Sequence, residues 1–154
     1  DAAPTTAPNA AGMPYLWDDL ELSPVVQSEW LGTPTFLNFF TTWCTYCRSE
    51  MQTLKELQAR YGDTLRVVLV HIPDREDEQT ARDYLQQEGL DGLTFVEDNG
   101  FFAYRYGISG FPTSVIADAD GYLSGYYPGI MTAEQMAQAA EKAGAAATEE
   151  AHAD

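Results

Sequence analysis

The residues of this sequence with the most reactive side chains are Cys44 and Cys47, the only two cysteines of the chain. They stand three positions apart in "FFTTWCTYCRSEM". Two thiols at this spacing allow a dithiol/disulfide couple, part of a metal site, or two inert thiols that pack as small apolar side chains. A structural zinc site needs about four ligands. The chain offers two cysteines and two histidines, one of them in the tail (His152), so a metal site is disfavoured.

The segments on either side predict where these thiols lie. The apolar run "TFLNFF" (35–40) is typical of a buried strand, and apolar residues at steps of three and four predict a helix from Thr45 to Tyr61. Cys44 would then start a helix, whose free N–H groups and dipole stabilise a thiolate. We expect Cys44 to be the exposed attacking thiol and Cys47, one turn further, to be the sheltered resolving thiol. The sequence therefore favours the redox couple.

The rest of the pattern alternates strands with helices. Further elements are expected as strands at 65–72 and 93–98, helices at 77–89 and 99–106, a hairpin over 113–129 with an Asp-Gly turn, and a helix at 132–144 that opens with a capping box of Thr132 and Gln135. Alternating strands and helices predict parallel pairing, and the hairpin predicts an antiparallel edge. The expected fold class is α/β, a three-layer sandwich with a mixed central sheet and helices on both faces.

Composition sets the domain limits. Residues 1–12 are rich in Ala, Pro and Thr, which is typical of a disordered linker, and residues 145–154 have no apolar periodicity and are expected to form a disordered tail. The domain is therefore expected over 13–144. No apolar run approaches the ~20 residues that a membrane-spanning helix needs.

The charge of the chain is strongly acidic. Twenty-four acidic against eight basic residues give a formal net charge of −16, and no basic cluster occurs. This balance excludes nucleic acid and an anionic membrane surface as partners. The acids are densest in "DREDE" (74–78), where a solvated, self-repelling surface is expected.

Three motifs in this order resemble the thioredoxin superfamily, and within it the extracytoplasmic thiol–disulfide oxidoreductases of the TlpA/ResA type. The first is "LNF" followed by Trp-Cys-x-x-Cys, with Asn38 six residues before Cys44, where cytosolic thioredoxins usually have aspartate. The second is Cys-Arg-Ser-Glu at 47–50, and the third is Gly-x-Pro-Thr around Pro112. The resemblance covers about residues 20–142, and 77–98 looks like the extra helix and strand of this subgroup.

The resemblance implies ping-pong exchange through a mixed disulfide, with no cofactor beyond a redox-active Cys44–Cys47 disulfide. It implies protein disulfides or dithiols as substrates, with an upstream thiol redox donor, in the bacterial cell envelope. Members of the family often serve cytochrome c maturation, envelope assembly or general thiol redox. They are commonly anchored or secreted, and residues 1–12 would suit the remnant of a membrane tether.

Four further residues receive a role from the resemblance, each beside a plainer interpretation. Glu50 is either a solvated glutamate near a helix start or a partly buried carboxylate with a raised pKa that handles the proton of Cys47. Pro112 is expected to be cis and to face the cysteines, which frees the backbone of Phe111 to pair with a substrate strand. Phe111 would cover the disulfide or contact substrate. Trp43 either flanks the active site or simply packs there.

Two positions stay open. The Thr45-Tyr46 spacer departs from relatives that carry proline in place of Tyr46, and the spacer influences the reduction potential. His71 is either a satisfied core histidine or, at the sheet edge of Cys44, a contributor to substrate contact or proton balance.

Three alternatives share this fold. A peroxiredoxin-like thiol peroxidase requires the motif Pro-x-x-x-Thr-x-x-Cys. Thr41 matches the threonine of that motif, but Leu37 stands in place of the proline. A copper-delivery protein of the Sco kind uses a cysteine spacing one residue longer plus a later histidine. A binding module would keep the two cysteines as a static disulfide.

Overall fold

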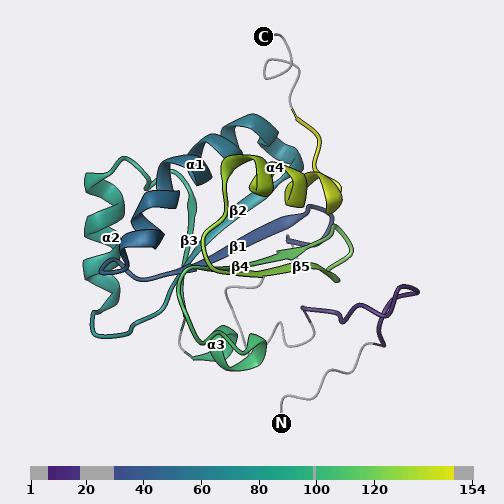
Figure 1. The fold of residues 1–154 in the computed structure, drawn as a ribbon, viewed down its shortest axis with the longest axis horizontal. Coiled ribbons are helices and arrows are strands. Elements are labelled where there is room, and N and C mark those ends of the chain that lie inside the picture. Colours follow the sequence, from purple (N-terminus) through teal and green to yellow (C-terminus); the bar gives the residue numbers. More distant parts are fainter. Residues whose placement is uncertain (1–6, 18–29, 99, 148–154) are drawn as a thin grey trace.

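The computed structural model describes residues 7–17, 30–98 and 100–147, which hold all the expected elements (Figure 1). In chain order the elements are β1 (Thr35–Phe40), α1 (Thr45–Tyr61), the 3-10 turn η2 (Gly62–Thr64), β2 (Arg66–His71), α2 (Glu78–Gln87), β3 (Thr94–Glu97), α3 (Phe101–Tyr106), β4 (Thr113–Ala117), β5 (Leu123–Pro128) and α4 (Ala133–Lys142). The first strand and the first helix have the predicted bounds, and the other elements are one to three residues shorter at their ends.

The strands form one mixed sheet in the order β3-β2-β1-β4-β5. β1, β2 and β3 are parallel, because helices carry the chain from each strand to the next. β4 runs antiparallel to β1, and β5 antiparallel to β4. The tight connection of this hairpin requires Gly121, whose φ is +92° and where a Cβ would lie 2.7 Å from the rings of Tyr15 and Trp17. The predicted mixed sheet is confirmed.

Helices cover both faces of the sheet, as expected for a three-layer sandwich. Figure 1 shows α1 and α4 on one face, α3 on the other, and α2 beside the β3 edge. Within β1, Phe36 and Phe40 belong to the apolar cluster under α1 and α4, while Leu37 and Phe39 belong to a second cluster on the opposite face. This alternation with a period of two fixes the register of the central strand.

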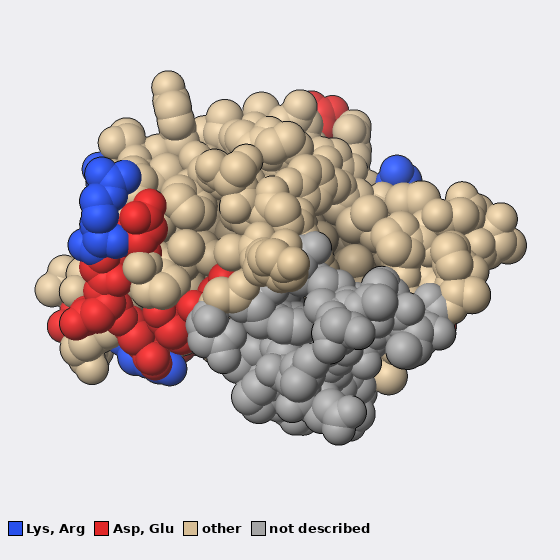
Figure 2. Space-filling model, turned by 90° about the horizontal axis from the view of Figure 1, so that it is seen from below, with Lys and Arg blue, Asp and Glu red and all other residues tan. Residues whose placement is uncertain are grey.

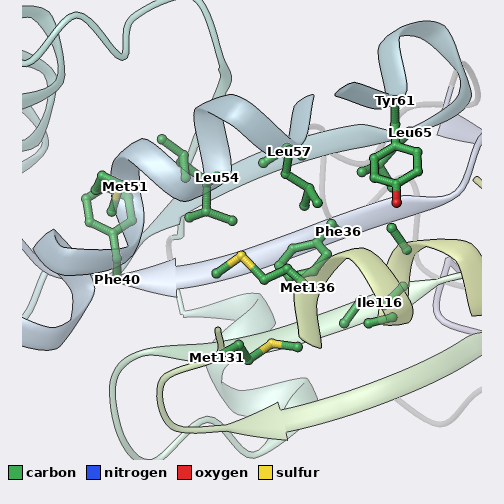
Figure 3. Packing of buried hydrophobic residues seen from close by; sticks show 14 of the residues in the cluster. Phe36, Phe40, Met51, Leu54, Leu57, Tyr61, Leu65, Ile116, Met131 and Met136 are labelled. Carbon is green, nitrogen blue, oxygen red and sulfur yellow. The ribbon is translucent and has the colours of Figure 1, made fainter. Parts of the chain in front are cut away.

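The apolar stripe of α1 anchors the helix that carries the cysteines. Its buried members are Cys47, Glu50, Met51, Leu54, Leu57 and Tyr61. Figure 3 shows Met51, Leu54 and Leu57 close to Phe36 and Phe40 of β1, with Met136 of α4 beside them. Full burial of one such large apolar side chain contributes roughly 1.5–3 kcal/mol. The packing therefore holds the N-terminus of α1 at the carboxyl edge of the sheet.

The ends of the described chain extend the expected domain slightly. Ala145 is buried, and the backbone of Ala146 exchanges hydrogen bonds with the hydroxyl of Thr64, so packing continues two residues past the predicted limit at 144. The expected disordered residues 1–6 and 148–154 lie outside the described residues, and the division into linker, domain and tail stays a prediction. Within the described part, no helix has the length and apolar character to span a membrane.

Candidate active site

The two cysteines meet at the N-terminus of α1. Cys44 is the N-cap residue, in an extended conformation, and its Sγ accepts a hydrogen bond from the backbone N–H of Cys47 at 3.2 Å. Cys47 is fully buried, as predicted, but Cys44 is only 8% exposed. The expectation of an exposed Cys44 is therefore wrong, because the capping side chain turns back along the helix and joins the apolar cluster of Cys47. Little of the Cys44 residue is therefore open to solvent.

The inner thiol is held in its protonated form. Burial raises the pKa of Cys47, and its contact with Cys44 and the nearby charges of Cys44 and Glu50 raise it further. A neutral Cys47 thiol must lose its proton before it can react as a nucleophile.

This asymmetry predicts a selective modification. In the reduced protein, iodoacetamide is expected to alkylate Cys44 at least about tenfold faster than Cys47, because the thiolate is the reacting form and Cys47 is buried and protonated. Peptide mass spectrometry over a time course gives the two rates. The urea-unfolded chain is the control, since both thiols should then react alike. Equal rates in the folded protein would contradict the assignment.

Glu50 lies inside the protein next to the couple. It is 2% exposed; one carboxylate oxygen accepts from Asn38 Nδ2 at 3.1 Å and the other from the backbone N–H of Met131 at 2.7 Å. Burial raises the pKa of Glu50, and these two hydrogen bonds offset only part of that rise. The solvated interpretation of Glu50 is thus wrong, because the turn that leads into α4 closes over it. The Glu50 carboxyl is therefore buried and hydrogen-bonded, with a raised pKa, and its exchange of a proton with Cys47 stays a prediction.

Asn38 and Ser114 complete the surroundings of Glu50 from the sheet. The Asn38 amide donates to Glu50 and also lies 3.2 Å from Ser114 Oγ on β4. An amide can donate where an aspartate could only accept, so Asn38 steadies an ionised neighbour instead of repelling it. Sequence reasoning noted Asn38 only as a departure from cytosolic thioredoxins, and it missed Ser114 and Met131.

The proline loop leads directly into β4, which begins at Thr113. The peptide bond between Phe111 and Pro112 is cis, as the family pattern led us to expect, and Pro112 O accepts a hydrogen bond from Gly129 N. Phe111 packs on the apolar cluster that contains both cysteines, and its ring meets Trp43 edge to face with centroids 6.1 Å apart. Trp43 and Phe111 therefore lie together, and Phe111 packs on the cluster that holds both cysteines. Their contact with substrate, and that of Pro112, stays a prediction.

Aromatic side chains form the outer rim. The indole N–H of Trp43 donates to Asp74 O at 2.7 Å, and the Arg75 guanidinium stacks 4.2 Å from the centre of the Trp43 ring. Tyr46, in the spacer between the cysteines, is 64% exposed. Trp43 is thus fixed in place, whereas Tyr46 projects towards solvent where a partner could contact it.

A buried cluster of His71, Glu76 and Glu97 lies at the ends of β2 and β3. The sequence drew attention to His71 but not to its two acidic partners. His71 is fully buried and its ring nitrogens contact Glu76 at 2.6 Å and Glu97 at 2.7 Å. The acids at 74–78 were expected to be solvated, but the Glu76 side chain is only 8% exposed because it turns inward to His71 and to Thr42. The signal that could have found it is an acid a few residues after a buried strand that ends in histidine.

Two further observations bear on what the site can bind. A pocket of about 520 Å³ lies between β5 and α4, lined by residues such as Tyr126, Ile130 and Lys142, and it includes neither cysteine. Among the residues that the structure describes, no group of three or more His, Cys, Asp or Glu is arranged to hold a metal ion. Both cysteines are buried, and the exposed aromatic side chains next to them in the sequence are Trp43 and Tyr46.

Comparison with known proteins decides the family. A family model described as a thioredoxin-like domain matches residues 27–144. The chain belongs to the thioredoxin-like family. Its fold class and the dithiol chemistry expected of Cys44 and Cys47 agree with that membership.

Individual relatives narrow the group within the thioredoxin-like family. The chain is 33% identical over 108 residues to the thioredoxin-like protein YneN of Bacillus subtilis, a match that covers 70% of this chain and 63% of YneN. It is 28% identical over 128 residues to the thiol-disulfide oxidoreductase ResA of Bacillus thuringiensis, covering 83% of this chain and 73% of ResA. The crystal structure of StoA from Bacillus subtilis superimposes with a TM-score of 0.64 at 28% identity, over 71% of this chain and 83% of StoA. The predicted thioredoxin-like fold of the TlpA/ResA type and the class of thiol–disulfide oxidoreductase are confirmed.

Proposed function

We propose that this thioredoxin-like chain reduces disulfides of proteins outside the cytoplasm, in the bacterial cell envelope, through the couple Cys44–Cys47. The observation that carries the proposal is the arrangement of the two thiols on one helical turn. Cys44 caps α1 and accepts the N–H of Cys47, while Cys47 is fully buried behind it. Cys44 can thus form the mixed disulfide with a substrate, and Cys47 lies one helical turn away, where it can resolve that disulfide.

In the first step the Cys44 thiolate attacks one sulfur of a substrate disulfide. A new bond forms between Cys44 Sγ and that sulfur, the substrate S–S bond breaks, and the second substrate sulfur leaves as a thiolate. The N–H groups at the start of α1 stabilise the thiolate before attack. Cys44 is only 8% exposed, and Phe111, whose ring meets Trp43, packs on the cluster that holds both cysteines, so the substrate is proposed to approach along these two rings.

In the second step Cys47 resolves the mixed disulfide. Glu50, as a carboxylate, accepts the proton of Cys47, and the resulting thiolate attacks Cys44 Sγ. The Cys44–Cys47 disulfide forms, the bond from Cys44 to the substrate breaks, and the substrate leaves as a second thiolate. Two electrons pass to the substrate, and an upstream thiol donor returns them to the couple. No cofactor beyond the couple is needed for this cycle.

The substrate proposed for this site is an extended segment of a folded or folding protein. We infer that the backbone of Phe111, before cis-Pro112, pairs with such a segment as an added strand. The exposed ring of Tyr46 and the aromatic pair of Trp43 and Phe111 supply apolar contacts on either side. Recognition of this kind accepts many sequences, as general envelope thiol redox or cytochrome c maturation would require.

The extracytoplasmic location belongs to the proposal. It is supported by the similarity to ResA, and the Ala/Pro/Thr-rich residues 1–12 suit a tether to a membrane anchor.

Dithiothreitol-coupled reduction of insulin tests the activity, and titration of the couple against dithiothreitol gives the direction of electron flow. A potential near about −270 mV supports a reductase, whereas one near about −120 mV would make the chain an oxidant. Consumption of hydrogen peroxide without insulin reduction would instead identify a peroxidase.

A further inference from the structure

Asn38 is a buried amide whose two ends are used unequally. Its Nδ2 donates to Glu50 Oε1 at 3.1 Å and to Ser114 Oγ at 3.2 Å. Its Oδ1 is enclosed by protein and has no hydrogen-bond partner in the part of the chain that the structure describes. Asn38 and Ser114 are both fully buried. A buried carbonyl oxygen without a partner is costly, so this oxygen needs an explanation.

Glu50 lies between two donors. Its Oε1 accepts from Asn38, and its Oε2 accepts from the backbone N–H of Met131 at 2.7 Å. Both contacts suit an ionised carboxylate, which only accepts hydrogen bonds. When Glu50 takes the proton of Cys47, however, the carboxyl gains an O–H that must itself donate. The N–H of Met131 cannot accept, and the sulfur of Cys47 is consumed in the disulfide, so the O–H needs another acceptor inside the protein.

Rotation of the Asn38 amide supplies that acceptor. A half-turn about the Cβ–Cγ bond exchanges the places of Nδ2 and Oδ1, so that Oδ1 faces Glu50 and Ser114. Oδ1 can then accept from the O–H of Glu50 and from the hydroxyl of Ser114, which donates as readily as it accepts. The three side chains thus have two complete arrangements that differ by one proton. In the first the amide donates to both neighbours, and in the second it accepts from both.

We propose that Asn38 is a positioning residue for thiol–disulfide exchange, whose amide rotates by half a turn when Glu50 takes the proton of Cys47, with Ser114 changing from acceptor to donor. The inference rests on the proposed function, in which Cys47 resolves a mixed disulfide. The proton passes from Cys47 Sγ to Oε1 of Glu50, and the electron pair of the S–H bond stays on sulfur as the thiolate. The rotated amide then holds the O–H of Glu50 while the Cys44–Cys47 disulfide forms.

The charges near Glu50 do not compete with this network. Its titratable neighbour on the same helix is Cys47, which in turn contacts Cys44. Its hydrogen-bond partners on β1 and in the turn before α4 are Asn38 and the backbone of Met131, and neither is ionisable. On the face drawn in Figure 2, acidic and basic side chains gather at one end of the molecule, whereas Glu50 lies inside and is 2% exposed.

NMR of the Asn38 side chain tests the rotation in the reduced protein, with signals assigned through bonds. At high pH, where Glu50 is ionised, the NH2 hydrogens of Asn38 should show strong nuclear Overhauser contacts to the β-hydrogens of Ser114. As pH falls these contacts should lose most of their intensity, because the NH2 group rotates away. Since burial raises the pKa of Glu50, the midpoint should lie above about pH 4.3, the ordinary value for glutamate.

A Glu50→Gln variant holds the rotated arrangement at every pH. The N–H of Met131 needs an acceptor, so the amide oxygen of the new side chain faces Met131 and its NH2 group faces Asn38. Asn38 can meet that NH2 group only with Oδ1. The Asn38 signals of the variant should therefore match the low-pH wild type throughout, although both thiols are still present. Glu134→Gln removes an exposed carboxyl at the start of α4 and should retain the wild-type change.

The rate at which the mixed disulfide is resolved gives the functional readout. Asn38→Leu removes donor and acceptor together from a side chain of similar size. Because both protonation states of Glu50 then lose a hydrogen bond, the pH midpoint of resolution should move by less than about half a unit, while the rate falls about tenfold. If the amide only donated, the ionised form alone would lose a bond, and the midpoint would rise by at least about one unit.

Two results would overturn the proposal. One is that larger rise in Asn38→Leu, and the other is a set of Overhauser contacts to Ser114 that persists at low pH or in Glu50→Gln. If Asn38→Leu does not fold, the NMR series on the wild type and Glu50→Gln still decides. Failure of the proposed function would appear differently, as insulin reduction that survives Cys44→Ser, whereas the NMR measurement needs no activity.

Discussion

A Cys44→Ser variant is expected to lose dithiothreitol-coupled insulin reduction by at least about a thousandfold, because the covalent step is removed and not merely slowed. A serine hydroxyl stays protonated at the N-terminus of α1, where the cysteine thiolate is stabilised by free N–H groups. Serine can still accept the N–H of Cys47 that Cys44 accepts at 3.2 Å, so the fold should be unchanged. Turbidity of the precipitating insulin B chain measures the rate.

Two further variants give this experiment its controls. Ser49→Ala alters an exposed side chain in the first turn of the same helix and should leave the rate within about twofold. Cys47→Ser should form the mixed disulfide but fail to resolve it, so a covalent adduct with substrate accumulates and is seen on non-reducing gels. Wild-type activity in Cys44→Ser would exclude the dithiol mechanism.

A Glu50→Gln variant is expected to slow resolution of the mixed disulfide by about a hundredfold near neutral pH, since the base that takes the Cys47 proton is gone. The pH dependence should change as well. In the wild type the rate of resolution rises as the Glu50 carboxyl, whose pKa is raised by burial, loses its proton. In the variant that rise disappears, and only the dependence on free hydroxide remains. Stopped-flow release of the second substrate thiol measures the step.

Stability provides an independent check on Glu50. Because burial raises the pKa of Glu50 in the folded protein, the folded state holds this proton more tightly than the unfolded chain. The stability that this proton confers is complete below the ordinary carboxyl pKa and is lost as pH rises through the raised value. The free energy of unfolding of the wild type, relative to Glu50→Gln, should therefore fall from acidic to neutral pH.

The sequence by itself determined the chemistry and the local frame that carries it. The spacing of Cys44 and Cys47, the apolar run before them and the helical periodicity after them are local properties of one short segment. Strand β1 and helix α1 consequently have the predicted bounds, with Cys44 at the N-cap. The capping box at Thr132 is present for the same reason, since a cap depends on residues within one turn.

Only the tertiary structure decided which groups surround the couple. Glu50 is charged and could have faced water; its burial follows from Met131, 81 residues away, and from Asn38 on the neighbouring strand. Cys44 could have been exposed, but the packing of the first turn covers most of it. These outcomes depend on contacts between distant segments, and no periodicity within a single segment encodes them.

The contacts of His71 likewise combine a local prediction with a tertiary outcome. The sequence placed it at the end of a strand, and strand order then set Glu97 opposite it on β3. Glu76 lies five residues after His71, but the chain must fold before it can also reach the Thr42 turn, 34 residues earlier in the chain. A thiol pair is specified by local spacing, whereas the position of Glu50 and the contact of Glu76 with the Thr42 turn are set by the sheet that brings these segments together.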